Sequence, residues 1–266
     1  MSAPLYRRIA ALSTEAVETL YLLDAQDCLA GISGYTVRPS RARAEKPKIS
    51  GFSSAQLERI LQVQPDLVIA FSDMQADLTR DLIRAGQTVL TFNQRDIAGI
   101  YRMIASLGAL VDKRSEAAQL VADLQQQVAQ AVSRAQGWTR RPLVYVEEWD
   151  QPIITGIGWI AEMVELAGGR YAFPEHAAAP DAKSRILADG DPVLQRAPDI
   201  VIASWCGKKF RPEQLCARPG WQDMPAVRNQ MVFEIKSPDL LSPGPAAITH
   251  GLAQISDIIA RWQEAQ

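Results

Sequence analysis

The first 111 residues alternate between short hydrophobic runs and longer segments in which apolar residues recur every three or four positions. Each short run has the length and aliphatic composition of a strand buried on both faces. Each longer segment has the apolar stripe of a helix that covers a sheet. Such alternation is typical of a parallel sheet covered by helices. The predicted strands are residues 7–12, 29–34, 67–70 and 88–92.

The alternation stops at residues 112–136, which contain neither proline nor glycine and are rich in Ala, Gln, Glu and Leu. These residues favour helices, so the segment predicts one continuous helix that ends at Gly137. At ~1.5 Å per residue, such a helix would be about 36 Å long. Its composition is that of a stiff spacer and not of a flexible linker.

Alternation resumes after this helix, with predicted strands at 142–148, 200–203 and 230–235. The sequence therefore predicts an α/β protein of two similar lobes, each with a mainly parallel sheet, joined by one long helix. The predicted boundaries are 1–111 for the N-terminal lobe, 112–137 for the helix and 138–266 for the C-terminal lobe.

One ten-residue phrase occurs twice, as LQVQPDLVIA at 61–70 and as LQRAPDIVIA at 194–203. The copies share seven of ten residues and lie 133 residues apart, half of the 266-residue chain. In each copy a helical segment meets Pro-Asp and then a buried strand, because proline cannot continue a helix interior. The offset favours two similar lobes over a solenoid, whose repeats are ~20–50 residues long. Candidate helix caps are Ser53 or Ser54 in the first copy and Asp189 or Asp191 in the second.

The composition is 47% hydrophobic and 22% charged, with a net charge of −2. This balance is ordinary for a globular protein and gives no reason to expect a nucleic-acid partner. The three cysteines include no CxxC pair, which argues against a disulfide framework or a zinc site. The N-terminus lacks the apolar core of a signal peptide, so we expect either a cytoplasmic protein or a mature periplasmic form. A monomer is expected.

The chain resembles the substrate-binding proteins of ABC importers for cobalamin, haem and ferric siderophores, whose lobes are joined by one backbone helix. The resemblance rests on RRIAALSTEAVETLYLL, GISGY, SSAQLERILQVQPDLVIAFSD, WIAEMVELAGG, VLQRAPDIVIAS and SPGPAAITHGLAQI, and it covers nearly the whole chain. It is greatest to the cobalamin-binding branch. The resemblance implies a small-molecule ligand held between the lobes and an ABC permease as partner. It also implies that Glu58 and Asp191 dock on permease arginines, whereas an ordinary surface residue and a helix cap are the alternatives.

Ligands of open parallel sheets bind beyond the carboxyl ends of the strands. Aromatic rings there could stack on a corrin or porphyrin. The resemblance independently indicates Tyr35, Phe52 and Phe71, and at Ile153 this chain departs from the family's aromatic residue. Plain core packing is the alternative for each ring. The predicted apolar contacts are Tyr35, Phe52 and Phe71 in the first lobe, and Trp149, Ile153, Trp159 and Trp205 in the second.

The same loops contain the predicted basic contacts Arg95, Arg185 and Lys208. Guanidinium groups suit carboxylates, and a cationic cleft would attract an anionic chelate such as a ferric siderophore. Nearby acidic residues leave a solvated rim of mixed charge as the alternative.

Enzyme motifs are weak. GIGWIA at 156–161 fits a dinucleotide fingerprint, but the predicted strand ends near Glu148, too far upstream of the glycine turn. Only two histidines occur, so a histidine triad or metal site is not expected, although His176 remains a candidate axial ligand. The sequence therefore predicts no enzyme, no catalytic or metal residues and no cofactor. A cytoplasmic carrier or sensor, and an enzyme that uses the cleft, are the alternatives to a transport protein.

Overall fold

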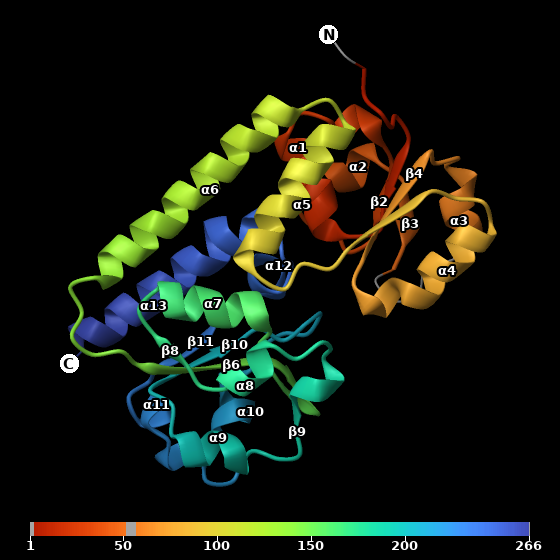
Figure 1. Ribbon diagram of the computed structural model, residues 1–266. Coiled ribbons are helices and arrows are strands. Elements are labelled where there is room, and N and C mark those ends of the chain that lie inside the picture. The colour runs from red at the N-terminus through yellow and green to blue at the C-terminus, as the bar shows by residue number, and fades with distance from the viewer. Residues whose placement is uncertain (1–2, 52–56, 266) are drawn as a thin grey trace. The chain divides into compact units, whose positions relative to one another are not determined.

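The computed structural model describes residues 3–51 and 57–265. The chain divides into two compact units, Met1–Leu124 and Gln125–Gln266, called here the N-terminal and C-terminal units. Each unit consists of a β-sheet with helices on both faces (Figure 1). The predicted α/β fold with two lobes is confirmed.

The N-terminal unit contains a five-stranded sheet in the order β3-β2-β1-β4-β5. All of its strand pairs are parallel. Because parallel strands need crossover connections, helices separate most of them along the chain. The strands are β1 (Ile9–Ala11), β2 (Leu29–Ser33), β3 (Lys48–Ser50), β4 (Leu67–Phe71) and β5 (Val89–Phe92).

Helices cover both faces of this sheet: α1 and α5 lie on one side, and α3 and α4 on the other (Figure 1). Under α3 and α4, Val68 of β4 packs in one buried cluster with Ile60 and Leu82. Side chains alternate between the faces of a strand, so residues of the same strands serve both layers. The helical segments are α1 (Thr14–Leu22), η1 (Gln26–Cys28), α2 (Ala42–Glu45), α3 (Leu57–Gln62), η2 (Asp73–Gln75), α4 (Ala76–Arg84) and α5 (Ile97–Leu110).

Helix α6 (Arg114–Ala135) is continuous over 22 residues, close to the predicted 112–136. The boundary between the compact units falls inside this helix, after Leu124. A separate linker domain at 112–137, with lobes ending at 111 and beginning at 138, stays a proposal.

The C-terminal sheet has the order β11-β10-β6-β7-β9, with β8 paired to β6. Strands β8, β10 and β11 run parallel to their partners, but β7 is antiparallel to both β6 and β9. The sheet is therefore mixed, with three parallel and two antiparallel strand pairs, so the prediction of a mainly parallel sheet holds and the antiparallel β7 adds to it. The strands are β6 (Leu143–Asp150), β7 (Ile153–Thr155), β8 (Arg170–Tyr171), β9 (Ile186–Leu187), β10 (Ile200–Ala203) and β11 (Val232–Glu234).

The reason for the mixed sheet is a hairpin. Asp150 pairs with Ile153, so only Gln151 and Pro152 separate β6 from β7. A two-residue connection permits only antiparallel pairing, whereas a parallel partner would need a crossover segment.

Helices α7 and α13 lie on one side of the C-terminal sheet, and α9, α10 and α11 on the other (Figure 1). The last predicted helix begins with a π-helical segment, η5, and continues as α13. The helical segments are α7 (Gly158–Leu166), α8 (Pro174–Ala177), η3 (Lys183–Arg185), α9 (Asp191–Arg196), α10 (Pro212–Cys216), η4 (Trp221–Asp223), α11 (Pro225–Arg228), α12 (Ser237–Leu240), η5 (Ala247–Leu252) and α13 (Ala253–Glu264).

The repeated phrase has the same backbone in both units. Each copy folds as helix, turn and buried strand, α3–β4 in one unit and α9–β10 in the other. Both turns contain a left-handed residue at the equivalent position, Gln64 with φ 47° and Ala197 with φ 48°. The prediction of helix, turn and strand in both copies is confirmed.

The Pro-Asp of each copy also has the same role. The Asp66 carboxylate accepts a hydrogen bond of 3.0 Å from the Arg8 backbone N–H, just before β1. The Asp199 carboxylate accepts one of 2.8 Å from the N–H of Leu143, the first residue of β6. Each aspartate thus satisfies a donor at the start of the neighbouring strand. Of the predicted caps, Asp189 accepts from the Asp191 N–H at 3.0 Å, while Ser53 and Ser54 lie outside the described residues.

Candidate ligand-binding site

Loops that follow β2 and β4 expose apolar side chains at the carboxyl edge of the N-terminal sheet. Tyr35 is 60% exposed, Val37 43% and Met74 56%. Large apolar side chains this exposed, at the edge where α/β folds bind ligands, indicate a contact surface. Sequence analysis identified Tyr35 but missed Val37 and Met74, because it looked only for aromatic rings.

The loop that carries Tyr35 is fixed from behind. The Arg43 guanidinium donates to the carbonyl of Gly34 at 2.6 Å and to that of Thr36 at 3.1 Å. The Gly34 N–H donates to the carbonyl of Ser50, the last residue of β3, at 2.7 Å. The backbone on both sides of Tyr35 is therefore held, which reduces the ordering cost of a contact with its ring.

The other predicted contacts of the N-terminal unit are less accessible. Phe71 ends β4 and is 7% exposed, and its backbone N–H donates to Gln75 Oε1 at 2.9 Å. Arg95 forms an ion pair of 3.0 Å with Asp73, so its charge already has a partner. Phe52 lies outside the described residues.

A buried carboxylate organises the carboxyl edge of the C-terminal sheet. Glu147 of β6 is fully buried and accepts hydrogen bonds from three side chains. Tyr145 donates its hydroxyl at 2.9 Å and Trp205 its indole N–H at 3.0 Å. Arg218 donates two bonds, at 2.6 and 2.8 Å. Burial, followed by the charge of Glu147, raises the pKa of Tyr145 well above its usual value, so the tyrosine remains a donor.

The structure brings together three of the predicted contacts of this unit. The Lys208 ammonium lies 5.2 Å from the centre of the Trp149 ring and 5.0 Å from that of Trp205. It also contacts both carboxylate oxygens of Asp150 at 2.6 Å. Trp205 is 3% exposed and packs edge-to-face on Phe210, whereas Trp149 is half-buried. A cation between two indole rings is a fixed feature of this edge.

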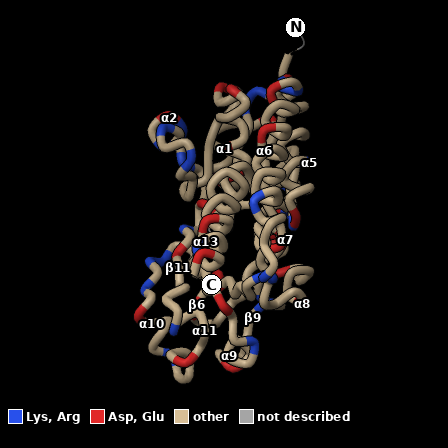
Figure 2. Tube along the Cα trace, turned by 90° about the vertical axis from the view of Figure 1, so that its left-hand side faces the viewer, with Lys and Arg blue, Asp and Glu red and all other residues tan. Residues whose placement is uncertain are grey.

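Trp205, Lys208 and Asp150 line a cavity of about 650 Å³ within the C-terminal unit. Small-molecule sites occupy ~300–1,000 Å³, so the volume suits a ligand. Figure 2 shows Lys and Arg positions gathered along the chain that leads to α10. Sequence analysis missed Arg211 and Arg218, although the basic stretch GKKFR from 207 to 211 is a visible signal. The lining residues are Asp150, Gln151, Trp205, Lys208, Lys209, Arg211, Gln214 and Arg218.

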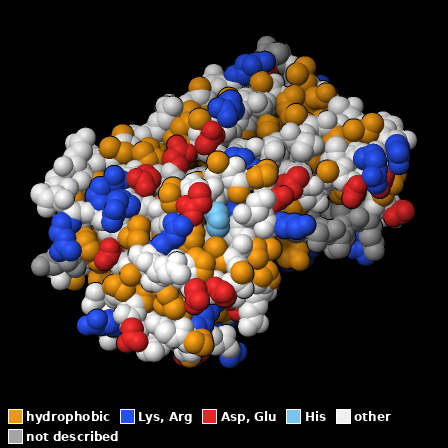
Figure 3. Space-filling view, turned by 60° about the horizontal axis from the view of Figure 1, so that its bottom comes forward, with side chains coloured by type: hydrophobic (Ala, Val, Ile, Leu, Met, Phe, Trp, Pro, Cys, Tyr) orange, Lys and Arg blue, Asp and Glu red, His pale blue; other side chains and the backbone are white. Residues whose placement is uncertain are grey.

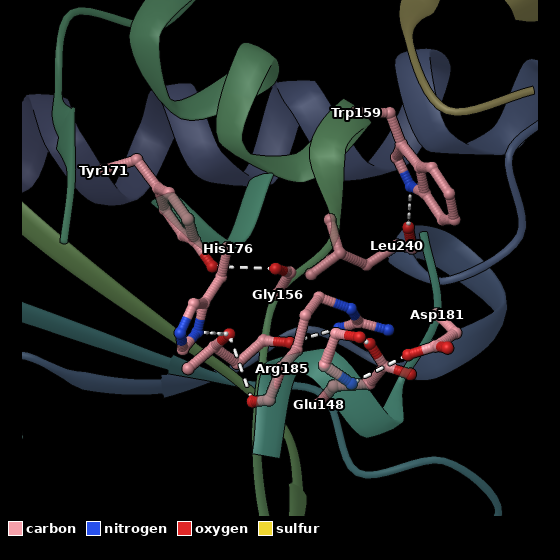
Figure 4. Close-up of polar contacts among 10 residues, drawn as sticks. Glu148, Gly156, Trp159, Tyr171, His176, Asp181, Arg185 and Leu240 are labelled. Atoms are coloured by element: carbon pink, nitrogen blue, oxygen red, sulfur yellow. Dashed lines mark hydrogen bonds and ion pairs between the residues drawn. The ribbon is translucent and has the colours of Figure 1, made fainter. Parts of the chain in front are cut away.

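Arg185 lies in a buried network that joins three strands (Figure 4). It is 2% exposed, forms an ion pair of 2.5 Å with Glu148 of β6 and donates to the carbonyl of Thr155 at the end of β7. The Thr155 hydroxyl is 2.9 Å from Nδ1 of His176. The bonds to Arg185 thus join the segment before β9 to the β6–β7 hairpin, and Ile153 is half-buried in that hairpin. These contacts give Arg185 a structural role, and its role in ligand binding stays a prediction.

Trp159 is held inside the same unit. Its ring is 3% exposed, and its indole N–H donates to the carbonyl of Leu240 at 2.9 Å (Figure 4). The bond links α7 to the last residue of α12. This burial supports the core reading of Trp159, whereas Tyr35 is the most exposed of the predicted rings that the structure describes.

The glycine turn at 156–161 also needs a correction. A further strand, β7, ends at Thr155, directly before Gly156, so the argument that the nearest strand ends too far upstream of the turn is wrong. The turn is nevertheless filled by protein: a Cβ on Gly156 would lie 3.1 Å from the Tyr171 hydroxyl and 3.2 Å from Val146. That hydroxyl donates to the Gly156 carbonyl at 2.9 Å (Figure 4).

A family model described as periplasmic binding protein matches residues 9–238 of the chain. The chain belongs to this family. Its relatives include an uncharacterized ABC transporter substrate-binding lipoprotein, YvrC, of Bacillus subtilis, which is 24% identical over 95% of this chain and 80% of its own length. The vitamin B12-binding protein of Vibrio parahaemolyticus is 26% identical over 91% of this chain and 85% of its own length.

Solved structures share the fold of this periplasmic binding protein. The vitamin B12 binding protein BtuF of Vibrio cholerae superposes with a TM-score of 0.78, at 21% identity, over 97% of this chain and 98% of that one. A possible iron-binding protein of Staphylococcus epidermidis gives a TM-score of 0.79, at 22% identity, over 96% and 98%.

The family assignment confirms three predictions. This periplasmic binding protein is a substrate-binding protein of the ABC-importer type, it is α/β with two lobes, and it is not an enzyme. Its relatives are periplasmic or lipoprotein binding proteins. Among the described residues, no helix is long and apolar enough to cross a membrane. In the same part of the chain, no group of three or more His, Cys, Asp or Glu side chains could hold a metal ion.

The two carboxylates implied by the resemblance are both on the surface. Glu58 and Asp191 are exposed residues in the first turns of α3 and α9. They are 133 residues apart, so each lies three residues before its copy of the repeated phrase. Acidic and basic side chains are interspersed on the face drawn in Figure 3, which fits the small net charge of −2.

Proposed function

We propose that this periplasmic binding protein captures a cobalamin-like metal chelate for an ABC importer. The exposed apolar surface of Tyr35, Val37 and Met74 at the carboxyl edge of the N-terminal sheet carries the proposal. A corrin or porphyrin offers a broad, partly apolar surface that would cover such side chains. The vitamin B12-binding relatives, at about a quarter identity over most of the chain, support the same ligand class.

The C-terminal unit supplies a second surface of different chemistry. Trp149, Trp205 and Lys208 lie together there beside the cavity. In this proposal, the N-terminal surface packs on the ring system of the chelate, while the C-terminal surface contacts its polar substituents. Phe52 and Phe71 would add apolar contacts to the first surface, and Ile153 and Trp159 would support the second from within the unit.

Delivery to a permease is the other part of the proposal. Glu58 and Asp191 would form ion pairs with basic residues of the permease, one from each unit. Their exposure and their equivalent positions, three residues before the two copies of the repeated phrase, support this role. A protein of this kind acts on the outer side of the inner membrane, so we propose a periplasmic location.

Isothermal titration of the purified protein with cyanocobalamin, haemin and a ferric siderophore tests the ligand class. We expect one of these chelates to bind, and Tyr35→Ala to weaken it about tenfold, because a ring contact contributes roughly 1 kcal/mol beyond its buried area. Leu22→Ala is the matched control. Leu22 is 53% exposed in the same unit, but it lies at the end of α1, towards the amino edge of the sheet. Failure of all three chelates to bind contradicts the proposal.

A further inference from the structure

The cavity of the C-terminal unit has an excess of positive charge. Lys208, Lys209, Arg211 and Arg218 contribute four cations to its lining, and Asp150 contributes the one carboxylate. The cavity is formed by one unit alone, after β10 and at the end of β6, so its composition can be assessed within that unit.

Two of the four cations already have carboxylate partners. Lys208 contacts both oxygens of Asp150 at 2.6 Å. Arg218 binds the buried carboxylate of Glu147 through two hydrogen bonds. These two ion pairs form the back of the cavity. Within each pair the opposite charges cancel, so the pairs add little to the net charge of the cavity.

The other two cations, Lys209 and Arg211, have no acidic partner among the described residues that line the cavity or lie behind it. Both are exposed; Arg211 directly precedes α10, and Lys209 lies two residues before Arg211. Together they leave the site with a net charge of about +2, next to the exposed amides of Gln151 and Gln214. A concave site with low-dielectric walls concentrates such a charge more than a flat surface does.

We propose that Lys209 and Arg211 form a subsite for a dianionic edge of the chelate, either two carboxylates or one phosphate. This inference rests on the proposed function and narrows its ligand class to chelates with acidic groups, such as a haem with two carboxylates, in contrast to cyanocobalamin. The planar fork of Arg211 matches the two oxygens of a carboxylate or phosphate, and the ammonium of Lys209 adds a point charge. The Trp205 ring forms the adjacent wall of the cavity. Its indole N–H already donates to Glu147, so the ring offers the ligand an apolar contact and not a hydrogen bond.

The decisive variant is the double substitution Lys209→Gln with Arg211→Gln. Its control is Arg170→Gln with Arg228→Gln, which changes the net charge equally in the same unit. Arg170 begins β8 and Arg228 precedes β11, so both exposed arginines lie at the amino edge of the sheet, away from the cavity. Neither pair contributes to the hydrophobic core, so all proteins are expected to fold.

The measurement is the dissociation constant of haemin, of its dimethyl ester and of cyanocobalamin, by quenching of tryptophan fluorescence. Haemin carries two carboxylates, its dimethyl ester carries none, and cyanocobalamin has no net charge. We expect haemin to bind the double variant at least about tenfold more weakly than wild type, and added salt to weaken it most in wild type. The ester should not distinguish the double variant from wild type. Equal haemin affinity in the double variant and the control overturns the proposal.

Citrate and inorganic phosphate serve as small probes of the subsite alone. Quenching by citrate that is lost in the double variant supports a carboxylate edge, and quenching by phosphate that is lost supports a phosphate edge. If cyanocobalamin binds but haemin, citrate and phosphate do not, the subsite is refuted while the proposed function stands. If citrate or phosphate binds through Lys209 and Arg211 but no chelate binds, the subsite stands and the proposed function falls.

Discussion

The two units contain the same helix–turn–strand phrase but surround it with different sheets. In the N-terminal unit β4 lies in an all-parallel sheet whose carboxyl edge exposes Tyr35, Val37 and Met74. In the C-terminal unit β10 lies in a mixed sheet whose carboxyl edge borders a basic cavity. The shared phrase sets the local backbone, while the loops after the strands set the chemistry. The same local pattern can thus present an apolar surface in one unit and a charged surface in the other.

Buried carboxylates show the same contrast between the units. Glu147 of the C-terminal unit is surrounded by three donor side chains. Glu15 of the N-terminal unit is 3% exposed, and its Oε1 has no hydrogen-bond partner in the described part of the chain. The Glu147 carboxylate holds three side chains in place, whereas burial of the Glu15 carboxylate lowers the stability of the folded protein.

The largest expected effect comes from removing Glu147. Glu147→Leu should lower the free energy of unfolding by about 3–5 kcal/mol, because it leaves Arg218 as an uncompensated, largely buried charge. Urea denaturation monitored separately by tryptophan fluorescence and by circular dichroism measures the loss. The control is Glu213→Leu, at an exposed position of α10, which should stay within about 0.5 kcal/mol of wild type. A similar small loss in Glu147→Leu would show that the network does not stabilise the unit.

Unlike Glu147, the buried Glu15 should destabilise the folded protein when its carboxyl group is charged. Burial raises the pKa of its carboxyl from 4.5 to about 7 in the folded protein. Because the folded state then binds the proton more tightly than the unfolded state, stability should fall as pH rises from about 4.5 to 7, by up to about 3 kcal/mol.

Glu15→Gln removes the titrating group, so the variant should be more stable than wild type at pH 7 and similar at pH 4.5. The measurement is the free energy of unfolding across this pH range. Glu58→Gln, an exposed carboxylate of the same unit, is the control and should leave the slope unchanged. A wild-type curve that rises over this range would contradict the raised pKa.

The left-handed turn residues test whether the two copies are energetically equivalent. Gln64→Val and Ala197→Val should each destabilise the protein by about 1–3 kcal/mol, because β-branched side chains strain a positive φ. Glycine at either position should be neutral or slightly stabilising. Chemical denaturation of all four variants measures the change in the free energy of unfolding. A clearly larger loss in one copy would show that the two turns contribute unequally to stability.

Sequence reasoning predicted the parts of the fold that depend on local pattern. The repeated phrase, the long helix and the alternation of elements follow from periodicity and from proline. The β6–β7 hairpin was missed because the apolar pair Ile153 and Ile154 is too short to stand out as a strand. The role of Glu147 was not predicted, because it depends on Tyr145, Trp205 and Arg218, which meet it only after folding.

The candidate site divides in the same way. Tyr35, Trp149 and Lys208 were predicted because they follow strands, and the structure places them at carboxyl edges. Burial separates Trp159 and Arg185 from them, and burial depends on packing partners distant in sequence. Lys209 and Arg211 differ from other surface cations in lining the cavity, and a sequence does not show which residues line a cavity.

The smallest expected effect concerns the docking carboxylates, which would show whether the two copies also act as a pair in function. Glu58→Lys and Asp191→Lys should each weaken binding to the cognate permease by less than about tenfold, since an exposed ion pair contributes ~1 kcal/mol or less and charge reversal adds repulsion. The double variant should lose the sum of the two binding free energies, because the sites are in different units.

Matched controls exist at the next equivalent pair of exposed positions, Gln62→Lys and Gln195→Lys, one turn along α3 and α9. Binding is measured by interferometry on permease reconstituted in nanodiscs, at low and high salt. Equal losses at Glu58 and Asp191 with none at the glutamines would extend the equivalence of the units to docking. A loss in one unit alone, or the same loss in the controls, would restrict the repeat to a structural role.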